Sequence, residues 1–250
     1  MESDPIEPSI ITDMKRALAA AFAVPLFALS LGAQRPQTES FTWSGELPTG
    51  GRVRIQNLNG NVMVEAGDGN KVVVTAAKIW RRGDPKSVRI EARQVTGGVI
   101  VCAIWSPTAP CDEGASDRGG RSQNNNDILV HFVVSVPRGA RVSVNTTNGD
   151  VRVDAPVSDV SVASVNGSVF TRAVTGDITA STINGGVTAF LPDAPDVDVD
   201  LQTASGQLRL DFPLVVVGRL DPAHVRGKLG RGGRKLKLTT INGDISLRKG

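Results

Sequence analysis

Residues that could carry chemistry are sparse in this chain, and the clearest set is a row of alternating carboxylates. Asp196, Asp198 and Asp200 alternate with apolar residues, so a β-strand would project all three from one face. Several oxygen ligands on one face are what Ca²⁺ binds. The glycine- and aspartate-rich nonapeptide of calcium-binding β-rolls is absent, however, and charged residues also protect an edge strand from pairing with other chains. We therefore expect a solvent-facing edge strand here, with no metal site.

A second set is the basic C-terminal flank. Between Gly218 and Gly250, nine Lys and Arg stand against two Asp, an excess of seven, compared with a net charge of +3 for the whole chain. Clustered positive charge attracts anions, so we expect binding of envelope polysaccharide or another anionic surface, or else a merely solvated flank. Nucleic acid is not expected, because this flank has no aromatic residue for base stacking. The candidate residues are Arg226, Lys228, Arg231, Arg234, Lys235 and Lys237.

The two cysteines of the chain, Cys102 and Cys111, have eight residues between them, two of which are prolines. They flank a turn that can close on itself, so we expect a disulfide in an oxidising compartment. Two cysteines and the two distant histidines do not have the spacing of metal ligands. The sequence predicts neither a metal nor a cofactor.

No enzyme motif stands out in the sequence. We find no Ser-His-Asp order with a supporting motif, no phosphate-binding glycine loop and no metal triad. We therefore expect a protein that is not an enzyme. A polysaccharide-cleaving enzyme is the alternative, because some β-solenoids cleave polysaccharides.

The elements that would position these residues follow a repeat. An Asn-Gly turn followed by a short apolar strand recurs at a constant interval, and a weaker turn at Gly176 lies half an interval out of phase. Asn and Gly tolerate the positive φ of tight turns, and a fixed period indicates a repeat architecture. The predicted structural turns are Asn148-Gly149, Asn166-Gly167, Gly176, Asn184-Gly185 and, after a longer interval, Asn242-Gly243.

Each nine-residue unit holds one strand and one corner, with apolar and polar residues alternating after the turn. One unit cannot bury its apolar side alone, so neighbouring units must cover it. We expect an all-β β-solenoid or β-roll with 18-residue coils; an antiparallel β-sandwich would show the same turns and is the alternative. One β domain is predicted over 41–250, with the stretch 227–233 leaving the sheet and a final strand at 235–238 returning to it.

The N-terminus resembles a secretory signal peptide. A basic start at Met14 precedes an apolar run over 17–31, which is shorter than the roughly 20 residues of a membrane span. We expect an N-terminal extension and signal peptide over 1–33, with Met14 as a possible true start, and a short linker over 34–40. The mature chain would have no transmembrane segment and would be periplasmic or at the cell surface.

The order of these features resembles the bacterial putative-adhesin family of β-solenoid domains. The features that carry the resemblance are the signal peptide, the Cys102/Cys111 segment, the repeated turns, Asp211-Phe212-Pro213-Leu214 and Gly232-Gly233-Arg234-Lys235-Leu236-Lys237-Leu238. The resemblance covers most of residues 40–249. It implies an exported repeat domain of unassigned role, with no catalytic residues to carry over.

The function expected from the sequence is an exported, non-enzymatic structural or interaction module at the cell envelope. An anion- or glycan-binding module that uses the basic flank is the first alternative. Self-association is also expected to be possible, because the ends of a solenoid expose unpaired strand edges.

Overall fold

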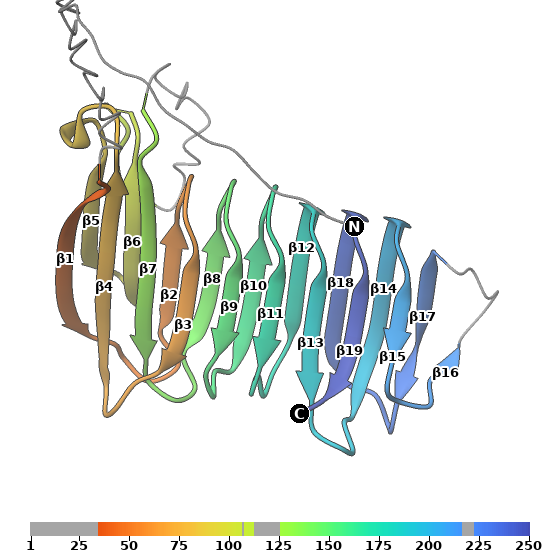
Figure 1. The fold of residues 1–250 in the computed structure, drawn as a ribbon. Helices are drawn as coiled ribbons and strands as arrows, with labels where there is room; N and C mark the ends of the chain where they lie inside the picture. The colour runs from red at the N-terminus through yellow and green to blue at the C-terminus, as the bar shows by residue number, and fades with distance from the viewer. Residues whose placement is uncertain (1–34, 107, 113–125, 217–222) are drawn as a thin grey trace, which may run out of the picture. The chain divides into compact units, whose positions relative to one another are not determined.

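Two β-sheets enclose one core in the computed structural model, which describes residues 35–106, 108–112, 126–216 and 223–250 (Figure 1). These residues belong to one compact unit, 35–250. The predicted extension and signal peptide, with Met14 and the cleavage site, lie outside the described residues. Within them the only helix is a 3-10 turn, η1 (Pro85–Ser87).

Within the described residues the first sheet, here called sheet A, has nine strands. In spatial order they are β1 (Gln37–Glu46), β4 (Lys71–Trp80), β7 (Leu129–Val136), β3 (Val62–Ala66), β9 (Val151–Asp154), β11 (Val169–Arg172), β13 (Val187–Leu191), β19 (Ile245–Lys249) and β15 (Leu208–Leu210).

The second sheet, sheet B, has ten strands in the same part of the chain. In spatial order they are β16 (Val215–Val216), β17 (His224–Leu229), β14 (Val197–Ser205), β18 (Arg234–Asn242), β12 (Ile178–Asn184), β10 (Asp159–Ala163), β8 (Arg141–Asn145), β2 (Arg52–Gln56), β6 (Gly98–Ile104) and β5 (Arg89–Val95).

The central strands stack as parallel coils, one repeat period to a coil. In sheet B, β8, β10 and β12 are parallel and pair Val142 with Val160 and Val160 with Ile178. In sheet A, β9, β11 and β13 are parallel, and Val169 pairs with both Val151 and Val187. Each coil therefore gives one strand to each sheet. This register confirms the predicted β-solenoid, and the parallel pairing contradicts an antiparallel sandwich for these coils.

The alternation of residues along each strand fills the space between the sheets. Val144 and Val162 of sheet B and Val153 and Val187 of sheet A belong to the same core cluster, and each is 1% exposed or less. Fully burying such a side chain stabilises by about 1.5–3 kcal/mol. Because the inward positions are apolar, the polar residue between each pair of valines must face outward.

The stacking order departs from the chain order near the C-terminus. Strands β18 and β19 lie between the coil of β12 and β13 and the coil of β14 and β15. The expected excursion over 227–233 is wrong in its first half, because β17 continues to Leu229 and pairs with β14. The expectation that Asp196, Asp198 and Asp200 lie on an edge strand is also wrong, since β14 is covered by β17 on one side and β18 on the other.

Antiparallel strands occupy both ends of the parallel stack. Strands β1, β4 and β7 form antiparallel pairs in sheet A, as β5 and β6 do in sheet B. At the other end β17 pairs antiparallel with both β14 and β16. Strand β1 begins at Gln37, so the second half of the segment expected as a linker, 34–40, is part of the first strand.

Candidate functional site

The predicted Asn-Gly turns form a continuous ladder along one corner of the stack. Each asparagine donates from Nδ2 to the Oδ1 of the asparagine in the preceding coil, at 2.7–2.8 Å. The ladder runs Asn242, Asn184, Asn166, Asn148 and Asn59. These residues satisfy one another, so we interpret them as structural.

The glycines of the same corner pack backbone against backbone. Gly149, Gly167, Gly185 and Gly243 have φ between 151° and 155°, a region that favours glycine. A Cβ on Gly167 would lie 2.1 Å from the carbonyl oxygen of Gly149. The same carbonyls accept hydrogen bonds from inward hydroxyls, for example Thr182 Oγ1 to Gly167 at 2.8 Å. Glycine is thus required for the close approach of successive coils.

The predicted turn at Gly176 lies at another corner, and its surroundings are also filled. A Cβ there would lie 2.3 Å from both the carbonyl oxygen of Ser158 and the Oδ1 of Asp159. That Oδ1 accepts from the N–H of Asp177 at 3.0 Å, and Asp177 Oδ1 accepts from the N–H of Lys235 at 2.8 Å. At this corner aspartate side chains accept from backbone N–H groups of the next coil, whereas the asparagines of the other corner bond side chain to side chain.

The alternating aspartates and half of the basic flank, predicted as separate features, lie together. Strand β17 runs antiparallel beside β14 and places Arg226 opposite Asp200 and Lys228 opposite Asp198. The charged atoms are 3.5 and 3.8 Å apart in these two pairs.

The tightest of these contacts joins Arg231 to Asp196. The guanidinium of Arg231 donates from Nη2 to Oδ2 of Asp196 at 2.9 Å, and the backbone N–H of Arg231 donates to Oδ1 at 2.8 Å. These hydrogen bonds hold the pKa of the Asp196 carboxyl below its usual value, mainly through the backbone N–H of Arg231 and then through its side chain. Half of the six candidate cations therefore already have carboxylate partners.

The other three candidate cations lie on β18. The Arg234 guanidinium donates to the carbonyl oxygen of Thr175 at 2.8 Å, which is a structural contact. Lys235 and Lys237 are exposed, and neither forms an ion pair with the residues that the structure describes. These two lysines are the part of the predicted set that remains open to an anion.

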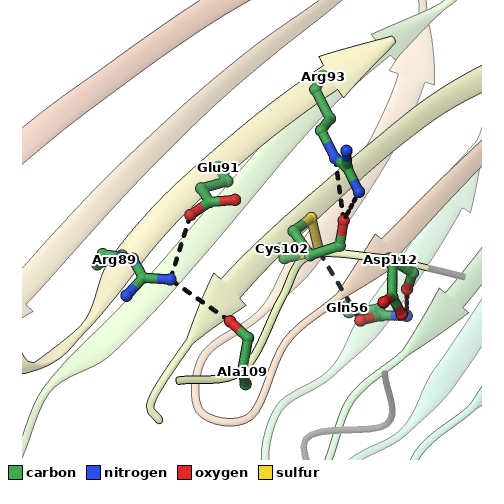
Figure 2. Close-up of a disulfide and its surroundings, with 8 residues drawn as sticks. Gln56, Arg89, Glu91, Arg93, Cys102, Ala109 and Asp112 are labelled. Atoms are coloured by element: carbon green, nitrogen blue, oxygen red, sulfur yellow. Dashed lines mark hydrogen bonds and ion pairs between the residues drawn. A yellow bond between two sulfur atoms is a disulfide. The ribbon is translucent and has the colours of Figure 1, made fainter. Parts of the chain in front are cut away.

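The predicted disulfide is present and closes a cover over the outer face of sheet B. Cys102 on β6 is bonded to Cys111, with 5.8 Å between their Cα atoms. Cys111 packs on Ile100, Cys102 and Ile104, each 3% exposed or less. Arg93 of β5 lies beside the disulfide in Figure 2, and its Nε donates to the carbonyl oxygen of Cys111 at 3.0 Å. The disulfide therefore stabilises an apolar cover at one end of the face.

Beside this cover lies a group of three arginines that the sequence analysis missed. Arg52 and Arg54 on β2 and Arg141 on β8 line two neighbouring hollows in the face of sheet B, of 230 and 420 Å³. Arg52 and Arg141 are in register on adjacent strands. These strands are far apart in the sequence, and only the Asn-Gly turn at Asn59, shared with Asn148, could have indicated that they meet.

A second group that sequence reasoning missed lies on the outer face of sheet A. The guanidinium of Arg152 stacks 3.9 Å from the ring centre of Phe170, and that of Arg172 lies 4.6 Å from that of Phe190. The two rings are 5.0 Å apart. Each arginine precedes its phenylalanine by one repeat period, so the repeat period could have predicted both contacts. These contacts stabilise neighbouring coils through cation–π attraction.

The part of the chain that the structure describes contains neither a cluster of metal ligands nor a membrane-crossing helix. No group of three or more His, Cys, Asp or Glu there is arranged to hold a metal ion. No helix in that part of the chain has the length and apolar character needed to cross a membrane.

Comparison with known proteins identifies the stacked coils. Residues 132–248 match the family model described as Toastrack DUF4097. This segment is similar to the Toastrack family. The match confirms the resemblance to a putative-adhesin family of unassigned function. The coil of β2 and β3 precedes the matched segment and stacks on it in the same parallel register.

Two solved structures that align with this chain come from bacteria. A "putative cell adhesion protein" from Clostridium sporogenes ATCC 15579 aligns with a TM-score of 0.57 at 10% identity, over 86% of this chain and 100% of that one. A "putative adhesin" from Bacteroides fragilis NCTC 9343 aligns over 84% of this chain and 97% of that one at 9% identity, with a TM-score of 0.31. At this identity the first match supports the fold alone. No curated protein matches the chain.

Proposed function

We propose that this chain is an exported, non-enzymatic interaction module of the bacterial cell envelope, adhesin-like in the broad sense. The single observation that carries the proposal is the register of the outer faces. Every parallel coil sets its outward side chains directly beside those of the next coil, as with Ser143, Ser161 and Thr179. The result is a set of straight rows across several strands, which suits contact with an extended partner.

Export is supported by two independent features. The N-terminal sequence has the basic start, apolar run and small residues of a signal peptide. The Cys102–Cys111 disulfide is of the kind that persists in oxidising compartments. The Clostridium structure is described as a "putative cell adhesion protein", which agrees with a role at the cell surface.

A retention assay tests the proposal. Purified protein is mixed with isolated envelope fractions at low ionic strength, sedimented and then washed with increasing salt. We expect retention at low salt and release at high salt, because exposed charges are screened within a Debye length of about 10 Å at 0.1 M salt. Absence of retention at low salt would contradict an envelope role.

The basic flank supports a narrower alternative, in which it binds an anion or glycan. Because Arg226, Lys228 and Arg231 are paired with aspartates, this alternative now depends on Lys235 and Lys237. The double variant K235A/K237A should then lose envelope retention while keeping its melting temperature. Unchanged retention would remove the flank as the binding site.

A further inference from the structure

The most unusual outward surface of sheet B is the one around Arg52, Arg54 and Arg141. Arg52 and Arg141 are exposed, lie in register on neighbouring strands and form no ion pair with any residue that the structure describes. The Nε of Arg141 donates to the carbonyl oxygen of Gly50 at 2.8 Å, which holds the side chain in place without neutralising its charge. Like charges directly opposite each other destabilise a sheet, and a bound anion would remove this repulsion.

From this cluster a polar row extends across five strands. Arg54 of β2 is in register with Ser143 of β8, Ser143 with Ser161 of β10, Ser161 with Thr179 of β12, and Thr179 with Lys237 of β18. Strands are about 4.8 Å apart, so the row is about 19 Å long. Its middle consists of short hydroxyl side chains, and these line the hollow of 420 Å³ together with the three arginines.

The chemistry of the row indicates what it would hold. Arginine binds carboxylate and phosphate groups through paired hydrogen bonds, and Ser and Thr hydroxyls both donate and accept. The same hollow is bordered by the carboxylates of Asp159 and Asp177, which would accept hydrogen bonds from sugar hydroxyls but repel a polymer that is charged at every unit. A chain with spaced carboxylates and many hydroxyls fits both parts of the surface.

We propose that the outer face of sheet B, from Arg52, Arg54 and Arg141 along Ser143, Ser161 and Thr179, is a binding site for an acidic polysaccharide of the uronic acid type. The arginines take the carboxylates, and the hydroxyl row takes the sugar hydroxyls of the adjoining units. The inference rests on the proposed function in one respect: the polysaccharide is taken to come from the cell envelope. It concerns residues other than those of the basic flank, apart from Lys237 at the far end of the row.

The test measures binding of the full-length protein to polygalacturonate at low ionic strength. We compare R52Q/R141Q with K71Q/K86Q, a control that removes the same charge from two exposed lysines outside both the proposed site and the basic flank. R52Q/R141Q should bind about tenfold more weakly or worse, since two charged hydrogen-bond donors are lost. K71Q/K86Q should change affinity by no more than about threefold. Equal losses in the two variants would overturn the site.

A second variant tests the path of the polymer with both arginines intact. S161E puts a carboxylate into the middle of the row and should also weaken binding of polygalacturonate; unchanged binding would contradict the proposed path. Thermal unfolding of each variant confirms that it is folded. Neutral dextran should not bind detectably. Tighter, arginine-dependent binding of polyphosphate than of polygalacturonate would overturn the uronic acid assignment.

Failure of the inference and failure of the proposed function give different results. Envelope retention without arginine-dependent polygalacturonate binding leaves the envelope role and removes this site. Polygalacturonate binding that requires Arg52 and Arg141, without retention on envelope fractions, leaves the site and removes the envelope as the source of its ligand.

Discussion

Asn184 donates from its side-chain Nδ2 to the Oδ1 of Asn166, 18 residues earlier, at 2.8 Å. Asn166 in turn donates to Asn148 at 2.7 Å, so it takes part in two rungs of the ladder. A carboxamide both donates and accepts, which lets the same residue type serve every rung. The repeat therefore selects Asn at this corner for a hydrogen bond between coils as well as for the turn itself.

Replacing Asn166 should weaken the stack. N166A removes two side-chain hydrogen bonds and should lower the free energy of unfolding by about 1–3 kcal/mol. The free energy of unfolding of N166D should lie between those of the wild type and N166A. The carboxylate of N166D still accepts from Asn184 but cannot donate to Asn148. Chemical denaturation measures the difference, with the exposed Asn145→Ala as control. A cost no greater than that of N145A would contradict a stabilising ladder.

Gly167 should be still less tolerant of change. G167A places a methyl group 2.1 Å from the Gly149 carbonyl oxygen at a φ of 151°, and we expect a loss of about 3 kcal/mol or more. Gly69 is a matched control, because its φ is 68° and nothing lies within 4 Å of its would-be Cβ. G69A should cost only the backbone strain, about 1–2 kcal/mol. Similar melting temperatures for the two variants would refute the close packing of coils.

The disulfide should add measurable stability. Cys102 and Cys111 are nine residues apart, and closing so short a loop stabilises by about 2–3 kcal/mol on the chain-entropy model. Reduction should also loosen the cover over Ile100 and Ile104. Melting curves with and without reductant, with C102A/C111A as the control that reductant cannot change further, measure the effect. An unaltered melting temperature on reduction would contradict it.

Asp196 should titrate below an ordinary aspartate. The N–H and then the side chain of Arg231 lower the pKa of this carboxyl from 3.8. A carboxyl whose pKa is lowered by folding stabilises the fold above its unfolded value and loses that contribution as pH falls through the lower, folded pKa. Carboxyl-detected NMR titration should find the low pKa. In R231A the pKa of Asp196 should rise only part of the way toward 3.8, because the backbone donor remains. A pKa of Asp196 at or above 3.8 in the wild type would contradict this prediction.

Arg52 should be unfavourable for the unliganded fold. Since it lies opposite Arg141 without an ion-pair partner among the described residues, R52Q should raise the free energy of unfolding by about 0.2–1 kcal/mol at low salt. The gain should shrink as salt screens the repulsion. Denaturation at two ionic strengths measures it. A loss of stability in R52Q would mean that the arginine has a structural role instead.

The coil was predictable because its signals are local. Asn-Gly at a constant interval, with alternating valines, defines both the turn and the inward face, as Val151, Val169 and Val187 illustrate. The stacking order was not predictable, because it depends on pairings across long separations. Nothing near Asn242 in the sequence indicates that it stacks on Asn184 rather than at the end of the array.

In the candidate sites, too, contacts with a local sequence signal were predictable and contacts between distant strands were less so. The disulfide could be predicted from two nearby cysteines. The pairing of Asp198 and Asp200 with Lys228 and Arg226 could have been found from their matching period-two spacing, which suits two adjacent antiparallel strands. The Arg52–Arg141 pair was harder to predict, because strands β3 to β7 separate those residues in the chain and the one indication of their pairing was the Asn-Gly turn shared by Asn59 and Asn148.

The most direct test of the account is the location of the full-length protein in its native cell. The envelope is separated from the soluble fractions at low salt and then washed at high salt, and the N-terminus of the protein is sequenced in each fraction. The account predicts a protein shortened by signal cleavage, bound to the envelope and released by salt. An uncleaved protein in the cytoplasmic fraction would contradict it.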